Sequence, residues 1–162
     1  MSYKAPAETR VGHIHLKVSD LERSIAFYRD VLGFDLKLRY GAQAAFMAAG
    51  AYHHHIGLNT WDSLGAGPVM KKAAGMYHVA FVYPSRAALG RAVGEVHAAG
   101  VEIYGAADHG VSEAVYFDDP DGNGIELYWD RAPEMWETSD EGQIKMINAP
   151  LDVDALIADG QV

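Results

Sequence analysis

The sequence predicts an α+β protein built from two copies of one module, each made of a strand, a helix and three further strands. Two observations predict this fold. Apolar and polar residues alternate and are then followed by a helical apolar pattern, first from residue 11 and again from residue 76. A glycine-rich linker, residues 62–75, separates the two copies. The duplication therefore places equivalent positions of the two modules in equivalent structural settings.

The first module spans residues 11–61 and follows an N-terminal tail of residues 1–10. Alternation predicts a strand over residues 11–18, and Asp20 then stands where a helix N-cap belongs. Apolar residues recur at helical spacing up to Gly33, a residue suited to a helix C-terminus. Glycine or small residues separate three short segments that predict strands: residues 34–39, 44–48 and 54–60.

The second module, residues 76–130, repeats this order. It predicts a strand over residues 77–83 and a helix that begins at Pro84-Ser85 and stops at Gly100. Gly90 and Gly94 weaken that helix. Three more strands complete the module: residues 101–104, 114–118 and 124–129, the last two joined by a turn over residues 119–123.

Residues 131–162 break the pattern and form a C-terminal extension, which we expect to pack back on the body of the protein.

The chain of 162 residues has no apolar run long enough to cross a bilayer. Its formal net charge of -9 disfavours nucleic acid or an anionic membrane as a partner and favours a small molecule. The absence of cysteine excludes disulfides, thiolate nucleophiles and cysteine-bound metals, and it is consistent with a cytoplasmic protein.

Three residues at matching points of the duplication suggest a metal site. His13 and His78 are each the first inward-facing residue of a predicted strand, and Glu126 lies between apolar residues in the last strand of the second module. Taken alone, each histidine would be an ordinary hydrogen-bonded core residue. Together, two imidazoles and one carboxylate are the ligand set of a non-haem Fe(II) centre with open positions. A buried carboxylate also needs a partner, and a metal ion is a good one.

Residues 12–21, 26–34 and 119–127 resemble the signatures of the vicinal oxygen chelate superfamily, which contains glyoxalases, bleomycin resistance proteins and extradiol dioxygenases. The resemblance covers residues 11–130. It implies curved mixed sheets around a central metal-binding cleft. Residues 52–61, 108–110 and 115–117 are similar to catechol 2,3-dioxygenase-type enzymes. The implied activity is Fe(II)-dependent cleavage of a catechol-like aromatic diol by O2, as used in aromatic hydrocarbon catabolism, with Mn(II) able to replace iron.

The resemblance also implies roles for three further residues. His54 matches an acid-base histidine, His109 a second pocket histidine, and Tyr116 a tyrosine that hydrogen-bonds a substrate oxygen. Strict alternation places His53 and His55 on the side of Gly57 and His54 on the other, so His54 needs a bulge or a strand that begins after it. If neither occurs, His55 is the alternative.

Two other activities stay open. A glyoxalase-like isomerase or lyase would use a fourth protein ligand, and the duplication aligns Gly57 with Glu126, a position where glycine offers no donor. That enzyme would need its fourth ligand from residues 53–55. A metal-free binding protein for a small molecule such as an antibiotic would leave the three donors idle. We expect a homodimer. Paired modules can associate within a chain or across a dimer, and the sequence does not choose between the two.

Overall fold

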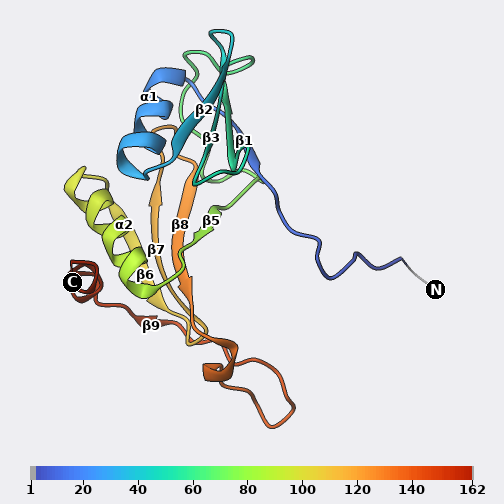
Figure 1. Cartoon of the computed structure of the whole chain (residues 1–162), viewed down its shortest axis with the longest axis vertical. Helices are drawn as coiled ribbons and strands as arrows, with labels where there is room; N and C mark the ends of the chain where they lie inside the picture. Colours follow the sequence, from blue (N-terminus) through green and yellow to red (C-terminus); the bar gives the residue numbers. More distant parts are fainter. Residues whose placement is uncertain (1–2, 162) are drawn as a thin grey trace. The chain divides into compact units, whose positions relative to one another are not determined.

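Each half of the chain folds into one mixed β-sheet with a helix along one face (Figure 1). The computed structural model describes residues 3–161. It divides into two units, residues 1–29 with 33–66 and residues 30–32 with 67–162. The α+β class and the two mixed sheets, of four and five strands, confirm the predicted fold class.

The first sheet has the strand order β1-β4-β3-β2, with β1 parallel to β4 and the other pairs antiparallel. Asp20 caps α1 as expected, because its side chain accepts a hydrogen bond from Arg23 N at 3.0 Å. The helix continues as a π-helical turn, Phe27–Val31, and Gly33 follows with φ 74°. The elements are β1 (Ile14–Lys17), α1 (Leu21–Ala26), β2 (Asp35–Tyr40), β3 (Ala44–Ala48) and β4 (Ile56–Asn59).

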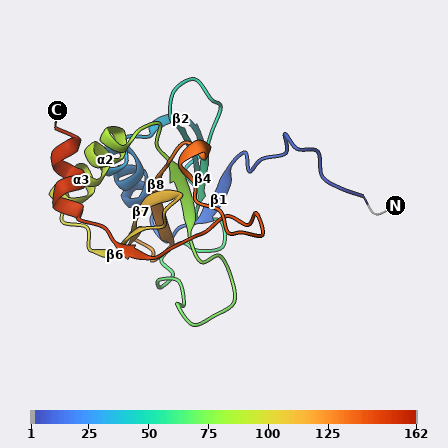
Figure 2. The same ribbon diagram turned by 90° about the horizontal axis from the view of Figure 1, so that it is seen from below.

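The second sheet has the order β5-β8-β7-β6-β9, with β5 parallel to β8. Helix α2 covers it, and α3 lies against α2 (Figure 2). Among residues 3–161, no helix has the length and apolar character needed to cross a membrane. The elements are β5 (Val79–Val82), α2 (Arg86–Ala98), β6 (Ile103–Asp108), β7 (Ser112–Asp118), β8 (Gly124–Asp130), a 3-10 turn (Pro133–Met135), β9 (Ala149–Pro150) and α3 (Val153–Asp159).

Strand register confirms the duplication residue by residue. Ile14 pairs with Ile56 in the first sheet, and Val79 pairs with Ile125 in the second. The residue before each first strand is a histidine, His13 or His78. The residue after Ile56 is Gly57 and the residue after Ile125 is Glu126, so these two positions are also equivalent.

The strand bounds differ from the predicted ones in two places that matter for the site. His13 and His78 lie one residue before β1 and β5 instead of inside them, because the ladder of paired residues begins at Ile14 and Val79. The strand expected over residues 54–60 begins only at Ile56. His54 is therefore free of strict strand alternation.

Helix α2 is unbroken over its 13 residues although it contains Gly90 and Gly94. The reason is close packing of the C-terminal extension. A Cβ added at Gly90 would overlap the Leu156 carbonyl oxygen, and one added at Gly160 would overlap the α2 backbone. Glycine at these positions lets α2 and α3 approach backbone to backbone, and Leu156 is fully buried as a result.

Candidate metal and substrate site

Four side chains of the second unit form a continuous line of polar contacts. His78 Nε2 lies 2.9 Å from Glu126 Oε2. The Tyr116 hydroxyl donates to Glu126 Oε1 at 2.9 Å and lies 2.9 Å from His109 Nε2. His109 Nδ1 lies 3.1 Å from the carbonyl oxygen of Ile147. All four predicted site residues of this unit are thus brought together.

Sheet register places the central pair of this line. Tyr116 on β7 is directly opposite Glu126 on β8. Along β7, Val115 and Phe117 are fully buried while Tyr116 is half-buried, so alternation turns Tyr116 to the face of the sheet away from the core. Glu126 is half-buried between two fully buried neighbours, Ile125 and Leu127, and faces the same way.

Gly124 allows His78 to reach this face. A Cβ at Gly124 would overlap the carbonyl oxygen of Tyr77 and lie 3.2 Å from His78 Cβ. Any larger residue would therefore push residues 77–78 away from the start of β8. The glycine two residues before Glu126 brings the imidazole next to the carboxylate.

His109 occupies the corner after β6, and an ion-pair network fixes that corner. Arg131 donates to both carboxylate oxygens of Asp108, at 2.6 and 2.9 Å, and also to Glu113 at 2.7 Å. Asp108 in turn accepts from Gly110 N at 2.8 Å, and Gly110 has φ 79°. The hydrogen bond from Arg131 is the main reason why the pKa of Asp108 lies below its ordinary value.

Burial raises the pKa of the Tyr116 hydroxyl, and the hydrogen bond to Glu126 raises it further. A phenol with a raised pKa keeps its proton at neutral pH. Tyr116 therefore acts as a hydrogen-bond donor here and not as a phenolate.

The first unit gathers histidines around His13. The ring centroids of His13 and His54 are 4.4 Å apart, and His54 also packs on Phe46 at 5.0 Å. His55 instead packs on Phe34 and Tyr52. The structure thus brings His54, and not the alternative His55, to His13. Burial, followed by the nearby histidines with His13 first, lowers the pKa of His54, which favours the neutral ring that a proton acceptor needs.

The position of Gly57 is covered by a neighbouring ring. Gly57 pairs with His15 across β1 and β4, and a Cβ at Gly57 would lie 2.9 Å from His15 Cγ. The His15 ring also packs on Trp61 and Phe46, with centroids 5.6 and 5.8 Å apart. A larger residue at Gly57 would displace this ring.

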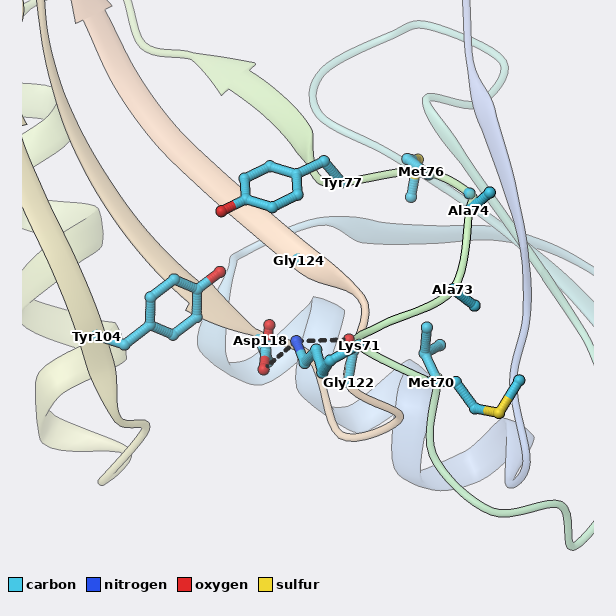
Figure 3. A pocket seen from close by; sticks show the side chains of 12 residues that line it. Met70, Lys71, Ala73, Ala74, Met76, Tyr77, Tyr104, Asp118, Gly122 and Gly124 are labelled. Atoms are coloured by element: carbon cyan, nitrogen blue, oxygen red, sulfur yellow. Dashed lines mark hydrogen bonds and ion pairs between the residues drawn. The ribbon is translucent and has the colours of Figure 1, made fainter.

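A pocket of about 560 Å³ opens in the second unit between the linker and the sheet (Figure 3). Asp118 and Gly124 line it. They pair with each other two residues along β7 and β8 from the Tyr116 and Glu126 pair, so alternation puts both pairs on one face. Lys71 bridges the floor, donating to Asp118 at 2.5 Å and to the Gly122 carbonyl at 3.0 Å. The volume suits a small organic molecule.

The donor set of the second unit fits a divalent metal ion. Two ligands about 2.1 Å from one ion and about 90° apart are separated by about 3 Å. The 2.9 Å between His78 Nε2 and Glu126 Oε2 matches this separation. His78 Nδ1 is buried without a hydrogen-bond partner in the described chain. Among residues 3–161, no group of three His, Asp or Glu side chains is placed to hold a metal ion. The second unit brings two candidate donors together, His78 and Glu126.

Comparison with known proteins identifies the family. The model of the glyoxalase/bleomycin resistance protein/dioxygenase superfamily matches residues 10–127. The chain belongs to this superfamily. The superfamily match covers both modules and all six predicted site residues.

Two of the similar curated proteins are dioxygenases by name. The chain is 36% identical to the catechol-2,3-dioxygenase of Bacillus subtilis over 93% of its own length and 52% of that protein. It is 30% identical to biphenyl-2,3-diol 1,2-dioxygenase 2 of Rhodococcus globerulus, over 89% of this chain and 72% of that protein. The chain therefore spans about half of the first relative.

Solved structures agree on the fold. A glyoxalase/dioxygenase from Nostoc punctiforme superposes with a TM-score of 0.66 at 25% identity, covering 82% of this chain and 99% of that one. A lactoylglutathione lyase from Agrobacterium tumefaciens gives a TM-score of 0.59 at 23% identity, covering 78% and 96%. The second match shows the fold alone.

Three features of the site were missed by the sequence analysis. The Ile147 carbonyl is a backbone group, so no side-chain pattern marks it. The Asp108 and Arg131 pair is 23 residues apart in sequence and carried no motif. Alternation places His15 on the face of His13, but this position suits an exposed residue as well as a pocket residue, so His15 was left out of the predicted site.

Proposed function

We propose that the protein is a metal-dependent extradiol dioxygenase that opens the ring of a catechol-like aromatic diol with O2. In this proposal His13, His78 and Glu126 hold Fe(II), with Mn(II) as a possible substitute. His54, His109 and Tyr116 contact the substrate and handle its protons. The bound metal supplies the coordination sites for the diol and O2 and a path for electrons between them.

The line of contacts from His78 to His109 is the observation that carries the proposal. It joins two candidate metal ligands to a hydroxyl and an imidazole through contacts of 2.9 Å. A diol must lose protons when it binds a metal and its product must regain one, so proton-carrying side chains next to the ligands are what this chemistry requires. The names of the similar curated proteins agree with it.

Each side chain has a distinct part in this scheme. Tyr116 keeps its proton, which it donates to Glu126 in this structure and which it can donate to a substrate oxygen instead when a diol is bound. His54, with its lowered pKa, is suited to accept a proton from the diol. The pocket beside Gly124 extends the same sheet face and can take a ring substituent.

A four-ligand isomerase is the second candidate, and Gly57 argues against it. Glycine has no donor, and His15 lies over the space that a side chain at this position would use. His15 itself carries ring nitrogens, however, so the number of protein ligands has to be measured.

The decisive experiment is anaerobic reconstitution of the chelator-treated protein with ferrous iron, followed by a panel of catechols and then air. We expect about one iron per chain and a yellow ring-opened product with at least one diol. Glu126→Gln and His78→Ala should lose the iron and the colour together. His97→Ala, an exposed histidine on α2, is the matched control and should keep both.

The alternatives give different results. Bound iron with four protein ligands by X-ray absorption, and no colour with any diol, would support an isomerase or lyase and overturn the dioxygenase. Tight binding of a small molecule that is unchanged in Glu126→Gln would support a metal-free binding protein.

A further inference from the structure

The C-terminal extension contacts the site through one residue, Ile147. Its N–H donates to the His109 carbonyl at 3.0 Å, and its own carbonyl oxygen lies 3.1 Å from His109 Nδ1. A Cβ on Gly110 would lie 3.4 Å from Ile147 Cγ1, so the corner after β6 and the extension are in close contact. Two backbone groups of one residue therefore hold both the backbone and the ring of His109.

Flanking structure keeps Ile147 in this place. On its C-terminal side, β9 pairs with β6 through Ala149 with Asp108 and Pro150 with Ala107. On its N-terminal side, a bridge between Thr138 and Ile144 closes a hairpin, and Lys145 N donates to the Glu137 carbonyl at 2.8 Å. The extension runs along the β6 edge of the second sheet as a result (Figure 2).

The contact with Ile147 decides which nitrogen of His109 carries the proton. A carbonyl oxygen can only accept a hydrogen bond, so Nδ1 must be the donor in this contact. A neutral imidazole has one N–H, and its second nitrogen is then an acceptor. His109 Nε2 therefore presents a lone pair to the Tyr116 hydroxyl 2.9 Å away.

We infer that Ile147 is a positioning residue, whose backbone carbonyl fixes His109 in the Nδ1–H form and aims Nε2 at Tyr116 as a proton acceptor. The single proton of Tyr116 then has two acceptors at the same distance of 2.9 Å, Glu126 Oε1 and His109 Nε2. A metal ion bound to Glu126 would make Oε1 the weaker acceptor. The Tyr116 proton would then turn to His109 Nε2. The expected effect on turnover rests on the proposed function, whereas the position of the proton on the His109 ring does not.

The form of the ring can be measured directly by ¹⁵N NMR of the metal-free full chain labelled at its eight histidines. The ring signals of His109 are those missing in His109→Gln. In the neutral state we expect His109 as the Nδ1–H form. Ile147→Pro removes the N–H that donates to His109 and displaces the carbonyl, so His109 should change to the Nε2–H form or a mixture.

Ile147→Ala is the matched control, because it keeps both backbone groups and removes only a side chain that is 53% exposed. The ring of His109 should keep the Nδ1–H form in this variant. If Ile147→Pro does not fold, an ester in place of the 147–148 amide, made with a synthetic C-terminal peptide, weakens the same carbonyl as an acceptor and should give the same shift of form.

Turnover gives a second and separate readout. In iron-loaded protein, Ile147→Pro should lower kcat roughly tenfold with little change in KM. This is the effect expected when His109 loses the hydrogen bond that orients its ring. Ile147→Ala, which keeps both backbone contacts, should lower kcat much less than Ile147→Pro does. A His109 ring in the Nε2–H form in the unaltered chain, or one unchanged by Ile147→Pro, overturns the inference. A protein with the expected ring form but no activity on any diol would refute the proposed function and leave the positioning intact.

Discussion

Replacing Gly90 by alanine should loosen the C-terminal helix although alanine is the better helix former. The added methyl would overlap the carbonyl oxygen of Leu156, which is backbone and cannot rotate away. Helix α3 would have to move off α2 by the width of that methyl group. Leu156, now fully buried, would lose part or all of its packing.

The magnitude follows from two opposing contributions. Full burial of a leucine side chain stabilises a protein by about 1.5–3 kcal/mol. Replacing glycine by alanine inside a helix contributes about 1 kcal/mol in the other direction. The net loss at Gly90 is therefore about 0.5–2 kcal/mol, or a fall in Tm of about 1–8 °C for a chain of this size.

Gly94 on the same helix supplies the control. A Cβ there would lie 3.6 Å from Ile157 Cγ2, an ordinary van der Waals contact. Gly94→Ala should therefore raise the Tm by about 2–4 °C. Thermal unfolding measures both variants, and hydrogen exchange of the α3 amides shows whether the helix has detached. A Gly90→Ala protein as stable as the original, with α3 still protected, would refute the close approach of the two backbones.

Three other changes test the site. Tyr116→Phe leaves Glu126 Oε1 and His109 Nε2 without their shared partner and should lower kcat about 10- to 100-fold in diol assays, whereas Tyr128→Phe should have little effect. His15→Ala should keep iron at about one per chain if the metal has three protein ligands; loss of iron would favour four. The folded pKa of Asp108 lies below its unfolded value, so its contribution to stability is present above about pH 4 and is lost as pH falls further. In Asp108→Asn, the free energy of unfolding should therefore depend less on pH below about pH 4.

The main elements of the fold were predictable because local signals and the duplication agree. Asp20 and Gly33 bound the first helix, and alternation marked the strands on either side. The C-terminal elements were not predictable in the same way. Helix α3 has seven residues and β9 has two, and both depend on packing against α2 and β6, which no local pattern encodes.

Within the site, sequence identified side chains but not the groups that orient them. Glu126 followed from the duplication and Tyr116 from the resemblance, and register then explained why they meet. The choice between His54 and His55 depended on where β4 begins, and strand ends are set by backbone pairing that extends over neighbouring strands. Orientation of His109 depends on a carbonyl 38 residues away, which only the folded chain brings close.

The duplication shows how the two modules differ in chemistry at one position. Register makes Gly57 and Glu126 equivalent, with a histidine ahead of the paired strand in each module. In the second module the acid is anchored by Tyr116, whereas in the first the equivalent position is glycine and His15 covers it. Restoring a carboxylate at Gly57 would thus require removal of the His15 ring as well. For the proposed metal site, the difference between three and four protein ligands would therefore depend on Gly57 and His15 together, and a single substitution at Gly57 is not a clean test of it.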